Sequence, residues 1–203
     1  MSSLIETEVK IAVADLDAIR QRLEAAGAAL RAPRVFERNV RYEDAAGTLT
    51  PNDIVLRLRQ DATARLTYKA PPDADTALAE NVRTRFEAEV TVSDFDTMDI
   101  ILRRLGFVPY VVYEKYRTTY RLGAAEVVLD EMPFGPFIEV EGTASAIDQA
   151  LAALGLADAP RILDSYLVLF ERVKAALALD AHDLTFDNFA GVDVPPEVFV
   201  GYH

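Results

Sequence analysis

Near the start of the chain, residues 5–11 read IETEVKI, and charged side chains occupy alternate positions of this stretch. Because successive side chains of a β-strand point to opposite faces, Glu6, Glu8 and Lys10 share one face of such a strand. Residues 15–27 follow, with apolar side chains at helical spacing. The sequence therefore predicts a strand that is charged on one face, followed by a short amphipathic helix.

This unit of strand and helix recurs twice further along the chain. A Glu-x-Glu strand at 86–90 precedes a helix at 94–106, and another at 138–141 precedes a helix at 145–155. Each helix begins with a residue that can cap its first turn and ends before a glycine that suits a left-handed conformation. The expected caps are Asp15, Asp94 and Ser145, and the glycines are Gly27, Gly106 and Gly155. A fourth helix is expected over 165–177.

The segments between these units have the alternation and the flanking turn residues of further strands. Short connections favour antiparallel pairing, which gives eight strands in all with the three repeat strands. One domain is expected over 1–178, followed by an irregular tail over 179–203 that either packs across an opening of the body or hangs free. The additional strands are expected at 34–43, 54–60, 64–70, 107–122 and 125–130.

The charge pattern of these strands favours a closed sheet. In any single strand, a charged face is most simply the solvated outer face of a sheet. At least six strands carry such faces, however, and the four helices have to cover the other, apolar face. The expected fold is therefore α+β: an eight-stranded antiparallel closed β-barrel, or tunnel, with helices packed outside. Eight strands leave room for interior side chains and one small ligand.

Ionised side chains of both signs on the inner face predict a wet interior that serves a ligand. Burying about a dozen ions would cost more than the ~5–15 kcal/mol by which a domain is stable. Carboxylates beside Lys and Arg suit a polyanion that arrives with divalent cations, because carboxylates bind Mg²⁺ or Mn²⁺ and the basic groups bind phosphate. An apolar carrier of the lipocalin kind would need an apolar lumen, which these strands do not supply.

Composition excludes several classes of site. The 203 residues include 21 Lys and Arg against 33 Asp and Glu, a net charge of −12 that argues against non-specific nucleic-acid binding. With no cysteine and two histidines, the chain has no disulfide, thiolate site, Cys nucleophile or multi-His zinc site. No apolar stretch is long enough for a membrane helix, and no signal peptide is expected at the start, so the expected location is the cytoplasm.

Read in order, the charged motifs resemble those of CYTH-domain proteins, also called triphosphate tunnel metalloenzymes. The first strand, with Glu6, Glu8 and Lys10, matches the family's ExExK signature, and the likeness runs from about residue 4 to 175. The length of the chain and the sequences of its motifs are most similar to those of the class IV adenylate cyclase branch. The other matching segments are Leu56-Arg57-Leu58-Arg59, Leu66-Thr67-Tyr68-Lys69, Glu87-x-Glu89, Lys115-x-Arg117, Asp130, 137–141 and Ser165-Tyr166-Leu167.

The resemblance implies a tunnel that binds a triphosphate together with Mg²⁺ or Mn²⁺. By the same resemblance, metal ligands would be Glu6, Glu8, Asp130, Glu139 and Glu141. Phosphate-binding residues would be Lys10, Arg57, Arg59, Lys69, Arg85, Lys115 and Arg117. The residues expected to take part in catalysis are Glu6, Glu8, Lys10 and Lys69. The expected partner is a triphosphate such as ATP or inorganic triphosphate, without nucleic acid or membrane, and a homodimer is left open.

The sequence departs from the family in its second strand. Residues 39–42 read NVRY, whereas many relatives carry an acidic residue before the aromatic one. The added positive charge of Arg38 and Arg41 has two interpretations, contact with a nucleotide or simple surface charge. Candidates to hold a base are Tyr42, Phe36 and Tyr113, each of which can instead be packing. The absence of Trp disfavours thiamine triphosphate, whose ring Trp could stack.

The same metal ligands and phosphate-binding residues are compatible with two reactions. Attack of a ribose 3′-hydroxyl on the α-phosphorus of ATP gives cyclic AMP and pyrophosphate, which is the activity that the resemblance favours. Attack of water on a terminal phosphorus instead makes the protein an inorganic or organic triphosphatase. A third reading is a non-catalytic module that binds polyphosphate or a nucleotide.

Overall fold

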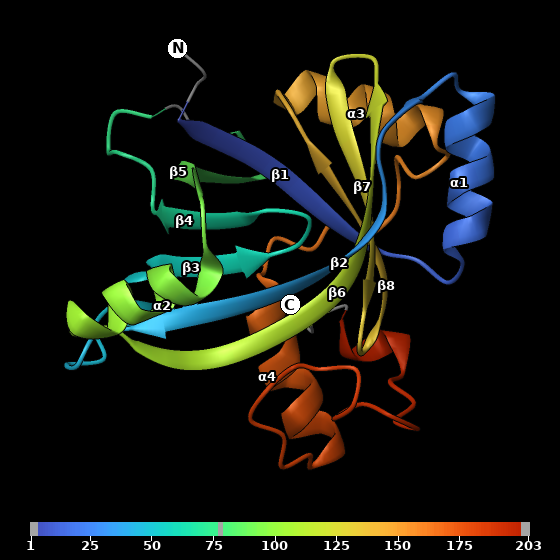
Figure 1. Cartoon of the computed structure of the whole chain (residues 1–203). Helices are drawn as coiled ribbons and strands as arrows, with labels where there is room; N and C mark the ends of the chain where they lie inside the picture. Colours follow the sequence, from blue (N-terminus) through green and yellow to red (C-terminus); the bar gives the residue numbers. More distant parts are fainter. Residues whose placement is uncertain (1–3, 77–78, 200–203) are drawn as a thin grey trace.

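The computed structural model describes residues 4–76 and 79–199, and these residues form a closed antiparallel barrel of eight strands with four α-helices outside it (Figure 1). The order of strands around the barrel is β1-β5-β4-β3-β2-β6-β7-β8. The predicted α+β tunnel is thus confirmed. The strands are β1 Ile5–Ala12, β2 Ala29–Glu43, β3 Val55–Gln60, β4 Ala64–Ala70, β5 Arg83–Val92, β6 Val108–Leu122, β7 Ala125–Met132 and β8 Gly135–Glu141.

The helices begin at polar caps, and two of the three caps that the sequence predicts are confirmed. The helices are α1 Leu16–Ala25, α2 Phe95–Arg104, α3 Ala144–Ala153 and α4 Tyr166–Leu177. The Asp15 and Asp94 carboxylates accept hydrogen bonds from first-turn backbone N–H groups, and the Ser165 hydroxyl does the same for α4. The prediction of Ser145 as a cap is wrong. Thr143 caps α3 instead, accepting from the Ala146 N–H at 3.2 Å, so Ser145 lies inside the first turn.

Three apolar clusters, all formed with the outer faces of the strands, attach the helices to the barrel. Helices α1 and α3 pack on β1, β7 and β8, with Leu23, Ile147 and Leu151 buried. Helix α2 covers β2 and β3, where Leu58 and Leu102 meet. These apolar stripes turn the other, charged face of every strand toward the barrel axis.

Strand β2 is longer than predicted because the alternation breaks at its start. It begins at Ala29 rather than residue 34, and its register against β6 shifts between Ala32 and Val35. Pro33 lies in that interval and has no backbone N–H to donate to a neighbouring strand. Figure 1 shows β2 and β6 as long, strongly curved strands that run side by side across the molecule.

The C-terminal tail, described as far as residue 199, packs against the body. The backbone of Leu184 pairs with β6, donating to the Val112 carbonyl at 2.9 Å and accepting from the Glu114 N–H at 2.9 Å. Phe189 and Phe199 are buried in one cluster with Phe134 and with residues of α4. Apart from a short 3₁₀ helix at Pro196–Val198, the described tail is irregular. No helix in the described part of the chain is long and apolar enough to cross a membrane.

Substitution of Leu58 tests the assignment of the outer face. Leu58 is fully buried under α2, so Leu58→Asp places a charge in an apolar cluster and should cost more than about 4 kcal/mol of the free energy of unfolding. The matched control is Val90→Asp, because Val90 lies on the same face through Leu66 but is 56% exposed. It should change stability by about 0.5 kcal/mol or less. Urea denaturation of both variants measures this, and a stable Leu58→Asp protein would reverse the assignment of faces.

Candidate functional site

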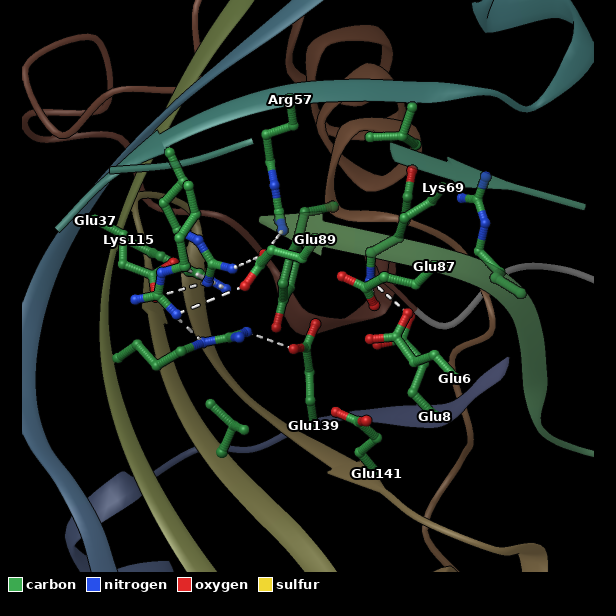
Figure 2. Close-up of a pocket in the computed structure, with 18 of the residues that line it drawn as sticks. Glu6, Glu8, Glu37, Arg57, Lys69, Glu87, Glu89, Lys115, Glu139 and Glu141 are labelled. Carbon is green, nitrogen blue, oxygen red and sulfur yellow. Dashed lines mark hydrogen bonds and ion pairs between the residues drawn. The ribbon is translucent and has the colours of Figure 1, made fainter. Parts of the chain in front are cut away.

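The barrel encloses a cavity of about 550 Å³ whose wall is built mainly from charged side chains. Every strand contributes to it, since the apolar outer clusters fix which face of each strand points inward. Figure 2 shows acidic and basic side chains converging on this space from different strands. The sequence-predicted residues found in its wall are Glu6, Glu8, Lys10, Arg57, Arg59, Lys69, Arg85, Lys115, Arg117, Glu139 and Glu141.

Among the predicted metal ligands and phosphate-binding residues, Asp130 alone lies outside the cavity wall. It is fully buried beside β6, and three donors occupy its carboxylate. Lys115 donates at 3.0 Å, Arg117 at 2.6 and 2.7 Å, and the Tyr166 hydroxyl at 2.9 Å. The carboxylate thus holds two phosphate-binding candidates in place. Its predicted role as a metal ligand stays a prediction.

Glu37 on β2 belongs to the same network, and the sequence reasoning missed it. Its carboxylate is 3.2 Å from Arg59, 3.7 Å from Lys115 and 4.0 Å from Arg117, and the residue is buried. Burial alone would raise the pKa of Glu37, but these cations hold it well below its usual range. The alternation of Glu37, Asn39 and Arg41 in the second strand was the signal that could have found it.

Carboxylates gather in another part of the cavity, around Lys69. The ammonium of Lys69 pairs with Glu6 and, at 2.9 Å, with Glu87 (Figure 2). Lys10 donates to Glu8 at 2.7 Å. Burial and the nearby Glu87 raise the pKa of Glu6, although Lys69 opposes this. Here the acids are crowded, and the cations only partly compensate them.

Glu141 is the least compensated of these acids. In the described part of the chain no basic group lies within ion-pair distance of it, and burial together with Glu6 and Glu126 raises the pKa of Glu141 to about 7. A bound cation would remove this unfavourable energy, and carboxylate oxygens are the ligands that Mg²⁺ and Mn²⁺ prefer. The donor set therefore fits such a metal, although among residues 4–76 and 79–199 no three acidic or histidine side chains are already grouped to hold one.

Two of the three candidates for holding a base do not face the cavity. Tyr42 points outward beneath α2 and its hydroxyl donates to Asp99 at 2.5 Å, while Phe36 is outside the barrel, where its ring contacts Tyr116. Both occupy even-numbered positions of β2, opposite to the inward positions of Glu37 and Arg41. Tyr113 does line the cavity, but its hydroxyl accepts a hydrogen bond from Arg57 at 3.1 Å.

Of the two extra arginines, Arg38 is exposed on the outer surface, whereas Arg41 is buried in the cavity wall.

Comparison with known proteins agrees with this architecture. A family model described as the CYTH domain matches residues 4–157, which is most of the chain. The chain belongs to the CYTH domain family.

Three relatives show how far the likeness extends. A Methanocaldococcus jannaschii protein named "Putative adenylate cyclase MJ0240" is 26% identical over 148 residues, covering 72% of this chain and 81% of the relative. The structure of the PH1819 protein from Pyrococcus horikoshii is 25% identical with a TM-score of 0.67, covering 82% of this chain and 99% of that one. A Hippeastrum protein described as an adenylyl cyclase candidate with a dominant triphosphatase activity has 22% identity and a TM-score of 0.58, covering 82% and 95%. At that identity the likeness shows the fold alone.

The uncompensated charge of Glu141 in this CYTH protein predicts a pH-dependent stability. Because the folded-state pKa is raised, the folded protein holds a proton that the unfolded chain has lost, so stability falls as the pH rises from about 4.5 to about 7. Glu141→Gln removes this loss. In EDTA it should melt at a higher temperature than wild type at about pH 8 and at an equal temperature at about pH 4.5.

Glu131→Gln is the control for this experiment, since Glu131 pairs with Arg34 on the outside of the barrel at 2.7 Å. It should follow the wild-type pH profile. Parallel profiles for wild type and Glu141→Gln would contradict the crowding of acids around Glu141.

Proposed function

We propose that this CYTH protein is a divalent-cation-dependent enzyme that processes a triphosphate in its tunnel. The observation that carries the proposal is the convergence of cationic and carboxylate side chains on one cavity inside the barrel. Arg59, Lys115 and Arg117 gather around Glu37, and Figure 2 shows Lys115 apart from Glu6 and Glu141. A chain of phosphates would be compensated by the basic side chains, and the cations bound to it would be compensated by the carboxylates. Family membership supports the same substrate class.

The carboxylates facing the cavity are the residues that would hold the metal ions. We assign this role to Glu6, Glu8, Glu139 and Glu141, with Glu87 close to Glu6 on the neighbouring strand. A bound divalent cation would polarise phosphoryl oxygens and neutralise part of their charge. Figure 2 shows Glu6, Glu8 and Glu141 on one side of the space and Lys115 on the other. Glu139 lies between them, and its carboxylate pairs with Arg117 and, at 3.3 Å, with Lys10.

The basic residues would bind the phosphate oxygens and stabilise the charge that develops during transfer. Arg59, Lys115 and Arg117 keep fixed positions because Glu37 and Asp130 hold them, so little reorganisation is needed when substrate binds. Lys10 remains protonated, since Glu8 and Glu139 raise the pKa of its ammonium in spite of burial. Lys10 Nζ and Lys69 Nζ can then donate hydrogen bonds to phosphate oxygens of the substrate, including those of the diphosphate that leaves.

The placement of the three candidates for holding a base favours hydrolysis over cyclisation. Cyclisation requires a place for a nucleobase, but Tyr42 and Phe36 face the outside of the barrel, and the hydroxyl of Tyr113, which lines the cavity, is bonded to Arg57. Water needs no such place. The printed name of the M. jannaschii relative supports the cyclase as the second candidate, and the description of the Hippeastrum protein joins both activities in one fold.

Product analysis separates these reactions. The protein is incubated with ATP, inorganic triphosphate and thiamine triphosphate, each with Mg²⁺ or Mn²⁺, and the products are separated by chromatography. Orthophosphate with a diphosphate is the expected result, and cyclic AMP with pyrophosphate would select the cyclase. Tight binding without any product would instead show that the protein is a non-catalytic binding module.

Substitution of single carboxylates tests the assignment of the catalytic residues. Glu8→Gln and Glu139→Gln remove a negative charge from the cavity wall while preserving shape, so turnover should fall by about 100-fold or more while the protein stays folded. The control is again Glu131→Gln on the outer face, which should keep wild-type turnover. Initial rates and circular dichroism of all three variants are the measurements, and wild-type rates for Glu8→Gln would remove Glu8 from the mechanism.

A further inference from the structure

Tyr113 is one of two aromatic side chains that face the cavity. Among residues 4–76 and 79–199, Tyr113 and Tyr166 are the only aromatic residues in the cavity wall. The ring of Tyr166 already lies 5.4 Å from the ammonium of Lys10 and 5.5 Å from that of Lys115, and its hydroxyl donates to Asp130 at 2.9 Å. A planar group of a ligand would therefore have to approach or displace the ring of Tyr113.

The side chain of Tyr113 reaches across β2. Tyr113 on β6 and Arg57 on β3 lie on either side of that strand, and the Arg57 guanidinium donates to the Tyr113 hydroxyl at 3.1 Å. The register sets Asn39 of β2 opposite Tyr113 and Arg41 opposite Arg57. The hydrogen bond therefore crosses β2 between Asn39 and Arg41, and it joins three neighbouring strands on the inner face of the barrel.

Asn39 lies beside this hydrogen bond and is cut off from the cavity. It alternates with Glu37 and Arg41 on the inner face of β2, yet it is fully buried and does not line the cavity. In the described part of the chain, neither its amide nitrogen nor its amide oxygen has a hydrogen-bond partner. A donor beside an acceptor is the pattern that pairs with the edge of a nucleobase. Tyr113 and Arg57 thus separate the cavity from an amide that is suited to hold a base.

The C-terminal tail fixes the backbone on both sides of Tyr113. Strand β7 pairs with β6 from residue 116 onward, and before that point Leu184 of the tail pairs with β6 instead, through hydrogen bonds of 2.9 Å with Val112 and Glu114. The Asp183 carboxylate also accepts from the Val112 N–H at 2.8 Å. Because β2 pairs with the other edge of this segment, Tyr113 would have to leave its place by rotation of its own side chain.

We propose that Tyr113 is a specificity-determining residue through which the tunnel selects a triphosphate without a nucleoside, such as inorganic tripolyphosphate. A bare chain of phosphates meets the charged side chains of the wall and needs no aromatic surface. The base of ATP would have to displace the Tyr113 ring and break its hydrogen bond with Arg57 before it could reach the Asn39 amide. The inference rests on the proposed function, because it narrows the substrate of that same cavity.

Removal of the ring tests this role. The affinities for inorganic tripolyphosphate and for ATP are measured by calorimetry in EDTA, where metal-dependent turnover does not occur. Wild type should bind tripolyphosphate about tenfold or more tightly than ATP, and Tyr113→Ala should lower this preference by about tenfold through tighter binding of ATP. Tyr113→Leu also lacks the planar ring but keeps more of the packing against the tail, so it should shift the ratio in the same direction even if the alanine variant is unstable.

Two further variants are controls for the ring. Tyr113→Phe keeps the ring and loses only the hydroxyl, so its preference should stay within about threefold of wild type. Tyr68→Ala removes a tyrosine from the outer face, since Tyr68 lies opposite Leu56 in the register of β3 and β4 and is 40% exposed. It should leave the affinities for both ligands unchanged.

Substitution of Asn39 gives a second readout that a merely structural role of Tyr113 would not produce. In the wild-type background Asn39→Leu should leave the ATP affinity unchanged, because the amide is separated from the cavity. In the Tyr113→Ala background the amide becomes accessible, and Asn39→Leu should then remove part of the gain in ATP affinity. The difference between the two backgrounds measures the coupling of the two residues.

Three results would overturn the inference: wild type that binds ATP as tightly as tripolyphosphate, an unchanged ratio of the two affinities in Tyr113→Ala and Tyr113→Leu, or an equal effect of Asn39→Leu on ATP affinity in both backgrounds. These outcomes are separate from the proposed function. A protein that prefers tripolyphosphate through Tyr113 but forms no product retains the selectivity and loses the enzyme. Active protein whose preference is unchanged in the Tyr113 variants does the reverse.

Discussion

The fold depends on the mutual compensation of buried charges inside the barrel. Asp130 is inaccessible to solvent, and such an ion is tolerated only when its partners replace the lost hydration. Lys115, Arg117 and the Tyr166 hydroxyl supply those partners from β6 and α4. The strands can therefore close into a ring whose inner face is ionic, while the outer faces pack on helices as in an ordinary core.

Positive and negative side chains are not balanced equally around the cavity. A ligand can bind where one sign of charge is in excess. Arg59, Lys115 and Arg117 are matched by Glu37 and Asp130, which makes that region rigid before substrate arrives. The surroundings of Glu141 have too much negative charge, and those of Arg41 too much positive charge. The folded protein therefore carries unfavourable electrostatic energy of both signs around one cavity. Stability and binding are linked here by the same residues.

Strand alternation was sufficient to predict most of the fold and most of the cavity wall. It placed Glu6, Arg57 and Glu139 on inner faces, because one apolar face per strand had to be covered by a helix. Alternation was insufficient where the position of a side chain depended on a partner distant in the sequence. Tyr42 faces outward because α2 covers it, and Glu37 became part of the site through cations on β3 and β6.

The tail shows the same limit of local pattern. Its irregular conformation was predicted, but its place was not, since that is decided by one backbone pairing of Leu184 with β6 and by scattered aromatic residues. These contacts have no period that a sequence reveals.

The site also depends on residues beyond the part of the chain that matches the family model. That match ends at residue 157, yet Ser165, Tyr166 and Leu167 line the cavity. The Tyr166 ring lies 5.4 Å from the ammonium of Lys10 and 5.5 Å from that of Lys115, and its hydroxyl donates to Asp130. Tyr166 in turn contacts Phe134 and Phe137, and Phe199 of the tail packs against both of those rings. The aromatic cluster outside the barrel therefore fixes the residue that closes the ionic network inside it, and the tail supports the cavity through this cluster.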